Sequence, residues 1–213
     1  YHKWIDANVS SNLPIDVIIP AIDKDLHTLP YVVRAARKHV KHPIAGIYIL
    51  APNSPAIISC AKELQCHYVN EQDVCSIAKS EIGFVINGIN RSGWIYQQLL
   101  KLNLVKVGTC KHHLVLDADT IFVKDVSFEY KGKLYFDFSD EYHSPYYVAY
   151  EKLTGYKHAM PVSFVSHYML FNKGMLENLK QHIYKQTGKS AEQAIIDLKS
   201  SVVDPSNFSE YET

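Results

Sequence analysis

Apolar and polar residues alternate in blocks along the first third of the chain. Apolar runs over residues 15–19, 44–50 and 66–70 are short and end at turn-forming or charged residues, which is typical of buried strands. Residues 28–40 and 54–64, which separate them, carry apolar side chains near helical spacing. This β-α-β-α-β order predicts an α/β fold with a mainly parallel central sheet and helices on both faces. We expect one domain over residues 1–213.

Local signals mark the ends of several expected helices. Thr28 and Ser54 precede two of them as candidate caps, and Asn90 or Ser92 precedes a third. Gly188 is a stop signal. A capping box is expected at the start of the last helix, from Ser190 and Gln193. The further elements expected are helices within 90–107, 144–156, 173–188 and 190–200, and strands within 112–123, 133–140 and 163–172.

Composition excludes several classes of protein. Lys plus Arg and Asp plus Glu both number 22, so no global field attracts nucleic acid or an anionic membrane. No apolar run approaches the roughly 18 residues that span a bilayer. The four cysteines lack CxxC or zinc-ligand spacing, which is typical of reduced residues in a cytoplasmic protein. The start at Tyr1 and the polar end FSEYET indicate a piece of a longer chain, whose other domains are then expected partners.

The strongest candidate for chemistry is HLVLDADTIFV, residues 113–123. Asp117 and Asp119 lie between two apolar runs, and residues two apart on a strand point to the same face. Carboxylates side by side repel one another, and a hard divalent cation removes that cost while it takes phosphate oxygens as further ligands. The competing interpretation makes one aspartate a helix cap and leaves the other solvated. The flanking apolar residues disfavour it, so we predict a metal site.

LVLDADTIFV resembles the DxD motif of nucleotide-sugar glycosyltransferases with the GT-A fold. VIIPAIDKD, NRSGWIYQQLLKL, SFVSHYMLFN and SEYET resemble segments of the capsular and cell-surface polysaccharide glycosyltransferases, so the resemblance covers nearly the whole chain. The chain is also similar to glycosyltransferase domains of large chlorella viruses that decorate the capsid glycoprotein. The resemblance implies a UDP-sugar donor, Mn²⁺ or Mg²⁺ as cofactor, and a glycan or glycoprotein acceptor, in the host cytoplasm if the source is viral.

The resemblance also implies roles for individual residues. Asp117 and Asp119 hold the metal, Ala118 lies beside the donor, and His167 is a candidate third ligand. A lone histidine in an apolar stretch is otherwise more often a core residue. For the charged residues among the donor contacts the ordinary interpretation is surface charge, and for the polar ones solvation. The implied donor contacts are Pro20, Ala21, Asp23, Lys24, Asp25, Arg91, Gln98 and Lys101.

The catalytic carboxylate is the least determined part of the site. The candidates for a general base or a nucleophile are Asp140, Glu141, Asp204 and Glu210 or Glu212, of which Asp140 and Glu210 are favoured. Asp137 and Asp140 follow a β pattern that leads to the same edge of the sheet as Asp117 and Asp119. Two rival functions stay open. A HAD-type phosphotransferase carries DxDGT after an apolar strand, but LDADTIF lacks the glycine and follows three expected strands. The other rival is a non-catalytic module that binds a nucleotide or a glycan.

Overall fold

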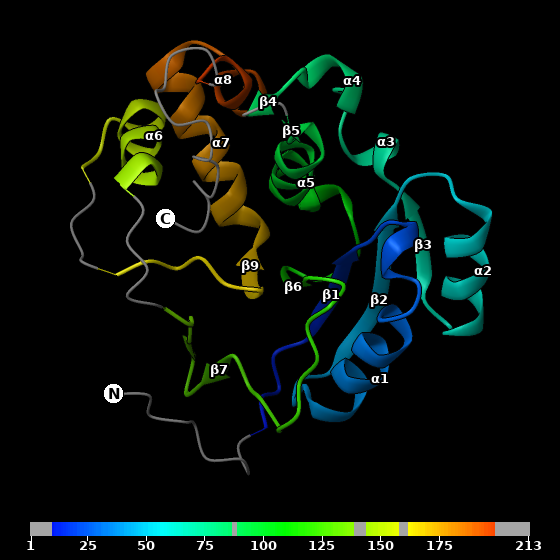
Figure 1. The fold of residues 1–213 in the computed structure, drawn as a ribbon. Helices are drawn as coiled ribbons and strands as arrows, with labels where there is room; N and C mark the ends of the chain where they lie inside the picture. Colours follow the sequence, from blue (N-terminus) through cyan, green and yellow to red (C-terminus); the bar gives the residue numbers. More distant parts are fainter. Residues whose placement is uncertain (1–9, 87–88, 139–143, 158–161, 199–213) are drawn as a thin grey trace. The chain divides into compact units, whose positions relative to one another are not determined.

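A computed structural model describes residues 10–86, 89–138, 144–157 and 162–198. Its centre is a five-stranded sheet with the strand order β3-β2-β1-β6-β9 (Figure 1). β1 is parallel to both β2 and β6, β2 is parallel to β3, and β9 runs antiparallel to β6. The predicted α/β class, with a mainly parallel sheet flanked by helices, is confirmed. The strands are β1 (Ile15–Pro20), β2 (Ile44–Ala51), β3 (His67–Asn70), β6 (His112–Leu116) and β9 (Tyr168–Asn172).

The chain divides into two compact units. The first takes in Tyr1–Val74, Lys106–Phe136 and His167–Asn172, and it contains the whole five-stranded sheet. Besides the sheet it holds η1 (Asp23–Asp25), α1 (Leu29–His39), α2 (Pro55–Glu63), α3 (Glu71–Val74), β7 (Glu129–Tyr130) and β8 (Lys133–Leu134).

The second unit takes in Cys75–Val105, Asp137–Ser166 and Lys173–Thr213. The helix η2 (Leu104–Lys106) lies where the chain passes from this unit back to the first. The expectation of a single domain stays a prediction. The elements of the second unit are α4 (Lys79–Ile82), β4 (Val85–Ile86), β5 (Ile89–Asn90), α5 (Ser92–Leu102), α6 (Ser144–Thr154), α7 (Lys173–Thr187) and α8 (Ala191–Leu198).

The core of the first unit explains why β1 is apolar throughout. All six residues of β1 are buried. Ile15, Val17 and Ile19 point into one cluster that also receives apolar side chains from α1 and α2, so both helices cover the same face of the sheet. Ile18 on the opposite face is equally buried. Burial of each such side chain contributes about 1.5–3 kcal/mol, which fixes β1 at the centre of the sheet.

Two of the predicted helix ends are confirmed. The Ser54 hydroxyl accepts a hydrogen bond from the Ile57 N–H (3.4 Å), with Pro55 in the first helical position of α2. Gly188 ends α7 with φ +71°, in the left-handed region that favours glycine. The Asn90 side chain accepts from the Ser92 N–H (2.9 Å) ahead of α5, whereas the Ser92 hydroxyl accepts from the Phe84 N–H.

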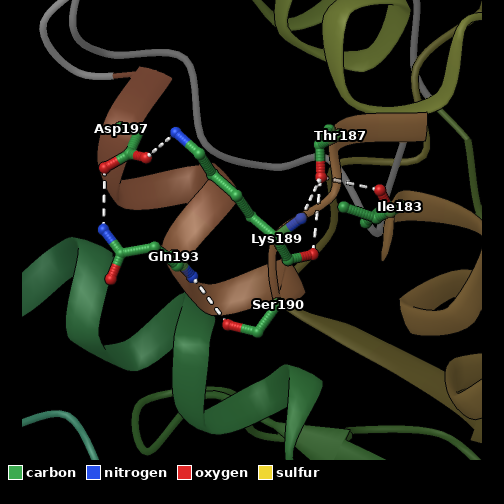
Figure 2. A network of polar contacts seen from close by, with 6 residues as sticks. All are labelled: Ile183, Thr187, Lys189, Ser190, Gln193 and Asp197. Carbon is green, nitrogen blue, oxygen red and sulfur yellow. Dashed lines mark hydrogen bonds and ion pairs between the residues drawn. The ribbon is translucent and has the colours of Figure 1, made fainter. Parts of the chain in front are cut away.

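The predicted capping box at α8 is only half formed (Figure 2). The Gln193 N–H donates to the Ser190 hydroxyl (3.2 Å), as expected. The Gln193 side chain does not reach back; it donates to Asp197 Oδ1 (2.7 Å), one helical turn further on. Asp197 Oδ2 also accepts from Lys189 Nζ. The charged carboxylate is a strong acceptor for the amide N–H of Gln193, so the side chain extends along the helix and its oxygen does not accept from the Ser190 backbone N–H.

The strand predicted within 133–140 is confirmed only for its first two residues. β8 has only two residues and pairs with β7 in a hairpin, and residues 135–138 form no strand. Lys131 and Gly132 make the turn with φ +52° and +76°, the pattern of a two-residue hairpin loop. The alternation in KLYFDFSD therefore reflects half-exposed aromatic residues and not a sheet position. Asp137 lies outside any strand, and Asp140 lies outside the described residues.

All four cysteines, Cys60, Cys66, Cys75 and Cys110, lie among the described residues, and none of them is in a disulfide there. Within the ranges that the structure describes, no helix has the length and apolarity to cross a bilayer.

Candidate functional site

The strand order creates one position in the sheet where loops diverge. From β1 the chain proceeds to β2 and β3 on one side, and it returns later to β6 on the other side of β1. Ligands of open α/β sheets bind at such a switch point, outside the carboxyl ends of the strands. The loop after β1 (residues 21–28) and the turn after β6 (residues 117–120) both leave from this edge, which we call the rim.

The two aspartates lie on a turn. β6 ends at Leu116, and the Thr120 N–H donates to the Asp117 carbonyl (3.0 Å), which closes a turn over residues 117–120. The expectation that both carboxylates share one strand face is therefore wrong, because the chain leaves the sheet before Asp119. Ala118 between them is buried (6% exposed), Asp117 is half-buried and Asp119 is exposed.

His167 lies directly beside this turn. Its Nδ1 is 3.4 Å from Asp117 Oδ2, and its side chain is 83% exposed. Its carbonyl accepts from the Asp117 N–H (3.0 Å), so the entry to β9 and the exit from β6 are fixed together. The interpretation of His167 as a core residue is wrong. The histidine stands at the start of β9, where the antiparallel register places it opposite the aspartates.

The loop after β1 is shaped by its own acidic residues. The Ile22 N–H donates to Asp25 Oδ2 (3.0 Å), so Asp25 closes the loop. The Ser54 hydroxyl donates to Asp23 Oδ1 (2.5 Å) and thereby ties this loop to the one after β2. Lys24 is exposed, whereas Pro20 and Ala21 are buried. Ser54 was recognisable from the sequence only as a helix cap, since its second contact is with a residue 31 positions away.

Thr28 has a different role from the one its position predicts. Its side chain makes no capping bond at the start of α1. The hydroxyl instead lies 2.8 Å from the Ala118 carbonyl, to which it donates, and 3.0 Å from the Asp25 carbonyl. Thr28 thus joins the first loop to the turn that carries both aspartates. No periodicity in the sequence signals a contact between residues 90 positions apart.

The remaining predicted residues belong to the second unit or lie outside the described ranges. Arg91 immediately precedes α5 and is exposed, as the sequence suggests. The solvated alternative for Gln98 and Lys101 is wrong, because α5 buries most of its surface and both side chains are nearly inaccessible (4% and 6% exposed). Glu210, like Asp140, falls outside the described residues. The roles of these residues in donor binding and catalysis stay predictions.

The rim supplies the kinds of atoms that bind a divalent ion. Carboxylate oxygens from Asp117 and Asp119 and an imidazole nitrogen from His167 are ligands that suit Mn²⁺, and the oxygens alone suit Mg²⁺. As they are placed in the described ranges, no three His, Cys, Asp or Glu residues gather closely enough to hold an ion. As they are placed, Asp117, Asp119 and His167 therefore do not form a metal site by themselves.

Comparison with known proteins gives one family and several distant structural similarities. The model of a family of unknown function, DUF6492, matches residues 15–212. No curated protein matches the chain. Mannosyl-3-phosphoglycerate synthase from Rubrobacter xylanophilus is 15% identical, with a TM-score of 0.34 over 51% of this chain and 31% of that one.

Two further solved structures show similarity at the same level. Glucosyl-3-phosphoglycerate synthase from Mycobacterium tuberculosis, in complex with Mn²⁺, UDP and glucosyl-3-phosphoglycerate, is 11% identical, with a TM-score of 0.32 over 50% of this chain and 33% of that one. The galactosyltransferase LgtC, in complex with donor and acceptor sugar analogs, is 15% identical, with a TM-score of 0.44 over 86% of this chain and 70% of that one. The chain spans about a third of the length of the two synthases.

Proposed function

We propose a function for this chain, which belongs to the DUF6492 family of unknown function: it is a metal-dependent glycosyltransferase that moves a sugar from a UDP-sugar onto a glycan. One observation carries the proposal. The DxD turn stands at the switch point of a mainly parallel sheet, with an exposed histidine 3.4 Å from its first carboxylate. The DxD resemblance in the sequence supplies the class of donor.

The chemistry of sugar transfer calls for the residues found at this rim. Departure of a nucleoside diphosphate leaves negative charge on the β-phosphate, and a divalent ion bound there supplies a Lewis acid for it. We assign Asp117 and Asp119 to hold that ion, with His167 as the third protein ligand. The exposed Lys24, in the loop after β1, adds positive charge for the diphosphate.

The incomplete ligand set has a direct consequence for binding. Three protein donors leave coordination positions of a six-coordinate ion for phosphate oxygens. Since no group of three described residues is already gathered around one point, ordering the side chains costs free energy that the phosphates help to offset. Mn²⁺ alone should therefore bind weakly, and Mn²⁺ and UDP should each strengthen the binding of the other.

The finer assignments extend this proposal. Arg91, at the amino end of α5, has the charge and position to bind a phosphate. Gln98 and Lys101 of the same helix are proposed donor contacts on the sequence resemblance alone, because both side chains are nearly inaccessible. The backbone at Pro20 and Ala21 is a further proposed donor contact. Asp23 and Asp25 are proposed acceptors for ribose or base. Asp140 and Glu210 remain the proposed catalytic carboxylates. The acceptor class, a glycan free or on a glycoprotein, rests on the sequence resemblance alone.

Isothermal titration of the chain with UDP, with and without Mn²⁺, tests the proposal. We expect binding that depends on Mn²⁺ and is lost in Asp119→Asn, while His167→Ala weakens it by about 10- to 100-fold, the order typical of a disturbed metal site. Glu63→Gln is the matched control, since Glu63 is an exposed carboxylate at the end of α2, next to the amino end of β3 and so at the opposite edge of the sheet from the rim. UDP binding of equal strength without metal would contradict the assignment.

Two enzyme assays separate this function from its rivals. A panel of nucleotide sugars, screened for Mn²⁺-dependent hydrolysis, should yield at least one that the chain cleaves slowly. A binding module would leave all of them intact. Turnover of p-nitrophenyl phosphate with Mg²⁺, abolished in Asp117→Asn, would instead indicate a phosphotransferase.

A further inference from the structure

One peptide group of the turn over residues 117–120 takes no part in the hydrogen bonds that form the turn. The Thr120 N–H bonds to the Asp117 carbonyl, and the Asp117 N–H bonds to the His167 carbonyl. The central peptide, between Ala118 and Asp119, takes part in neither bond. In β-turns this central peptide is the group that reverses between the type I and type II forms. Its orientation determines where the Asp119 carboxylate points.

The Ala118 carbonyl belongs to this central peptide, and it receives the Thr28 hydroxyl at 2.8 Å. The backbone of Thr28, which carries this hydroxyl, is fixed by hydrogen bonds of both its N–H and its carbonyl. The Thr28 carbonyl accepts from the N–H groups of Tyr31 (2.9 Å) and Val32 (3.2 Å) in the first turn of α1, and the Thr28 N–H donates to the Asp25 carbonyl (3.0 Å). The side-chain contact to the Ala118 carbonyl therefore comes from a residue that is itself fixed.

We propose that Thr28 is a positioning residue, which locks the central peptide of the Asp117–Thr120 turn and so presets the direction of Asp119 for metal binding. Reversal of the peptide to the type II form would require φ > 0 at Asp119, a conformation that the aspartate does not adopt here. Without the hydroxyl, the turn samples other peptide orientations, and part of the binding free energy of the metal is spent on ordering it.

The same hydroxyl couples the two halves of the rim. The loop after β1 ends at Thr28, and it includes Asp25, which closes it, and Asp23, which Ser54 anchors. Hydrogen bonds thus connect the loop after β2 with the loop after β1, and the loop after β1 with the turn over residues 117–120. This inference rests on the proposed function for its ligand, but the lock on the peptide is a property of the protein alone.

Thr28→Val removes the hydroxyl at nearly constant volume, and Thr28→Ser keeps it. We expect the dissociation constant for Mn²⁺ in the presence of UDP to rise about tenfold or more in Thr28→Val and to stay within about twofold in Thr28→Ser. Thr154→Val is the matched control, because its hydroxyl also donates to a backbone carbonyl at 2.8 Å, that of Tyr150 within α6.

A readout without ligand separates this inference from the proposed function. Amide NMR of the metal-free protein should show a shifted or exchange-broadened Asp119 N–H in Thr28→Val, and an unchanged one in Thr28→Ser and Thr154→Val. An unperturbed Asp119 signal in all three variants would contradict the proposal that Thr28 fixes this peptide group. If the wild type binds neither Mn²⁺ nor UDP while Thr28→Val still perturbs Asp119, the proposed function fails and the positioning role stands.

Discussion

A glycine far from the rim gives the sharpest test of how the sheet is assembled. Gly108, in the segment before β6, has φ +67°, and a Cβ built on it would overlap the Asp16 carboxylate, with Asp16 Cγ only 2.7 Å away. Asp16 lies on β1 and is fully buried. Its Oδ2 accepts from the N–H groups of Thr109 and Cys110, both at 2.7 Å. The carboxylate thus holds the segment that leads into β6, the strand that ends at the DxD turn.

The cost of Gly108→Ala follows from these contacts. The left-handed backbone costs a non-glycine residue roughly 1–2 kcal/mol. The added methyl group also displaces a buried carboxylate from two hydrogen bonds, each worth about 1.5–3 kcal/mol because the acceptor is charged. We expect a loss of roughly 4–8 kcal/mol in the free energy of unfolding. Gly132→Ala, with φ +76° and nothing within 4 Å of its Cβ, should lose only the backbone part, about 1–2 kcal/mol.

Urea unfolding followed by circular dichroism measures both variants on one scale. The comparison isolates the effect of the carboxylate, since both glycines have a positive φ but only Gly108 has Asp16 beside it. Equal destabilisation of the two variants, within about 0.5 kcal/mol, would refute the reasoning, because measured values for independent sites agree to about that margin. It would mean that Asp16 contributes nothing to holding the segment before β6.

Two further predictions concern ionisable groups. Burial lowers the pKa of His42, and the neutral ring accepts a hydrogen bond from the Phe128 N–H (2.9 Å). The free energy of unfolding should therefore decrease as the pH falls from 6.5 toward the lowered pKa, and His42→Gln should flatten this pH dependence in urea titrations on either side of pH 6.5. Lys180→Met should cost about 2 kcal/mol of unfolding free energy, because it strands the half-buried Glu192: burial raises the pKa of this carboxyl, whereas the 2.7 Å pair with Lys180, a backbone hydrogen bond and Asn103 together hold it below its ordinary value. Lys189→Met, at an exposed pair, should cost under about 0.5 kcal/mol, and equal losses in the two variants would contradict the role of burial.

The first half of the fold could be predicted because its signals are local. The apolar runs of β1 and β2 need only burial to become strands, and Ser54 with Pro55 places the start of α2. The hydrophobic effect and backbone sterics decide both within a few residues. The strand predicted within 133–140 stops after two residues for the opposite reason. Its alternation of aromatic and polar residues satisfies a strand, but pairing requires a partner, and β7 offers only two residues.

The candidate site shows the same division between local and distant information. Asp117 and Asp119 are recognisable because they follow a buried strand, and His167 because it interrupts an apolar stretch. Their geometry, however, comes from contacts between residues far apart in the chain: the histidine reaches the turn through the register of β9 on β6, and Thr28 reaches Ala118 across 90 positions. A motif therefore identifies which residues can bind a metal, whereas contacts within the sheet determine how their side chains are oriented. For that reason, a variant of Thr28, which carries no ligand atom, is as strict a test of the site as a variant of either aspartate.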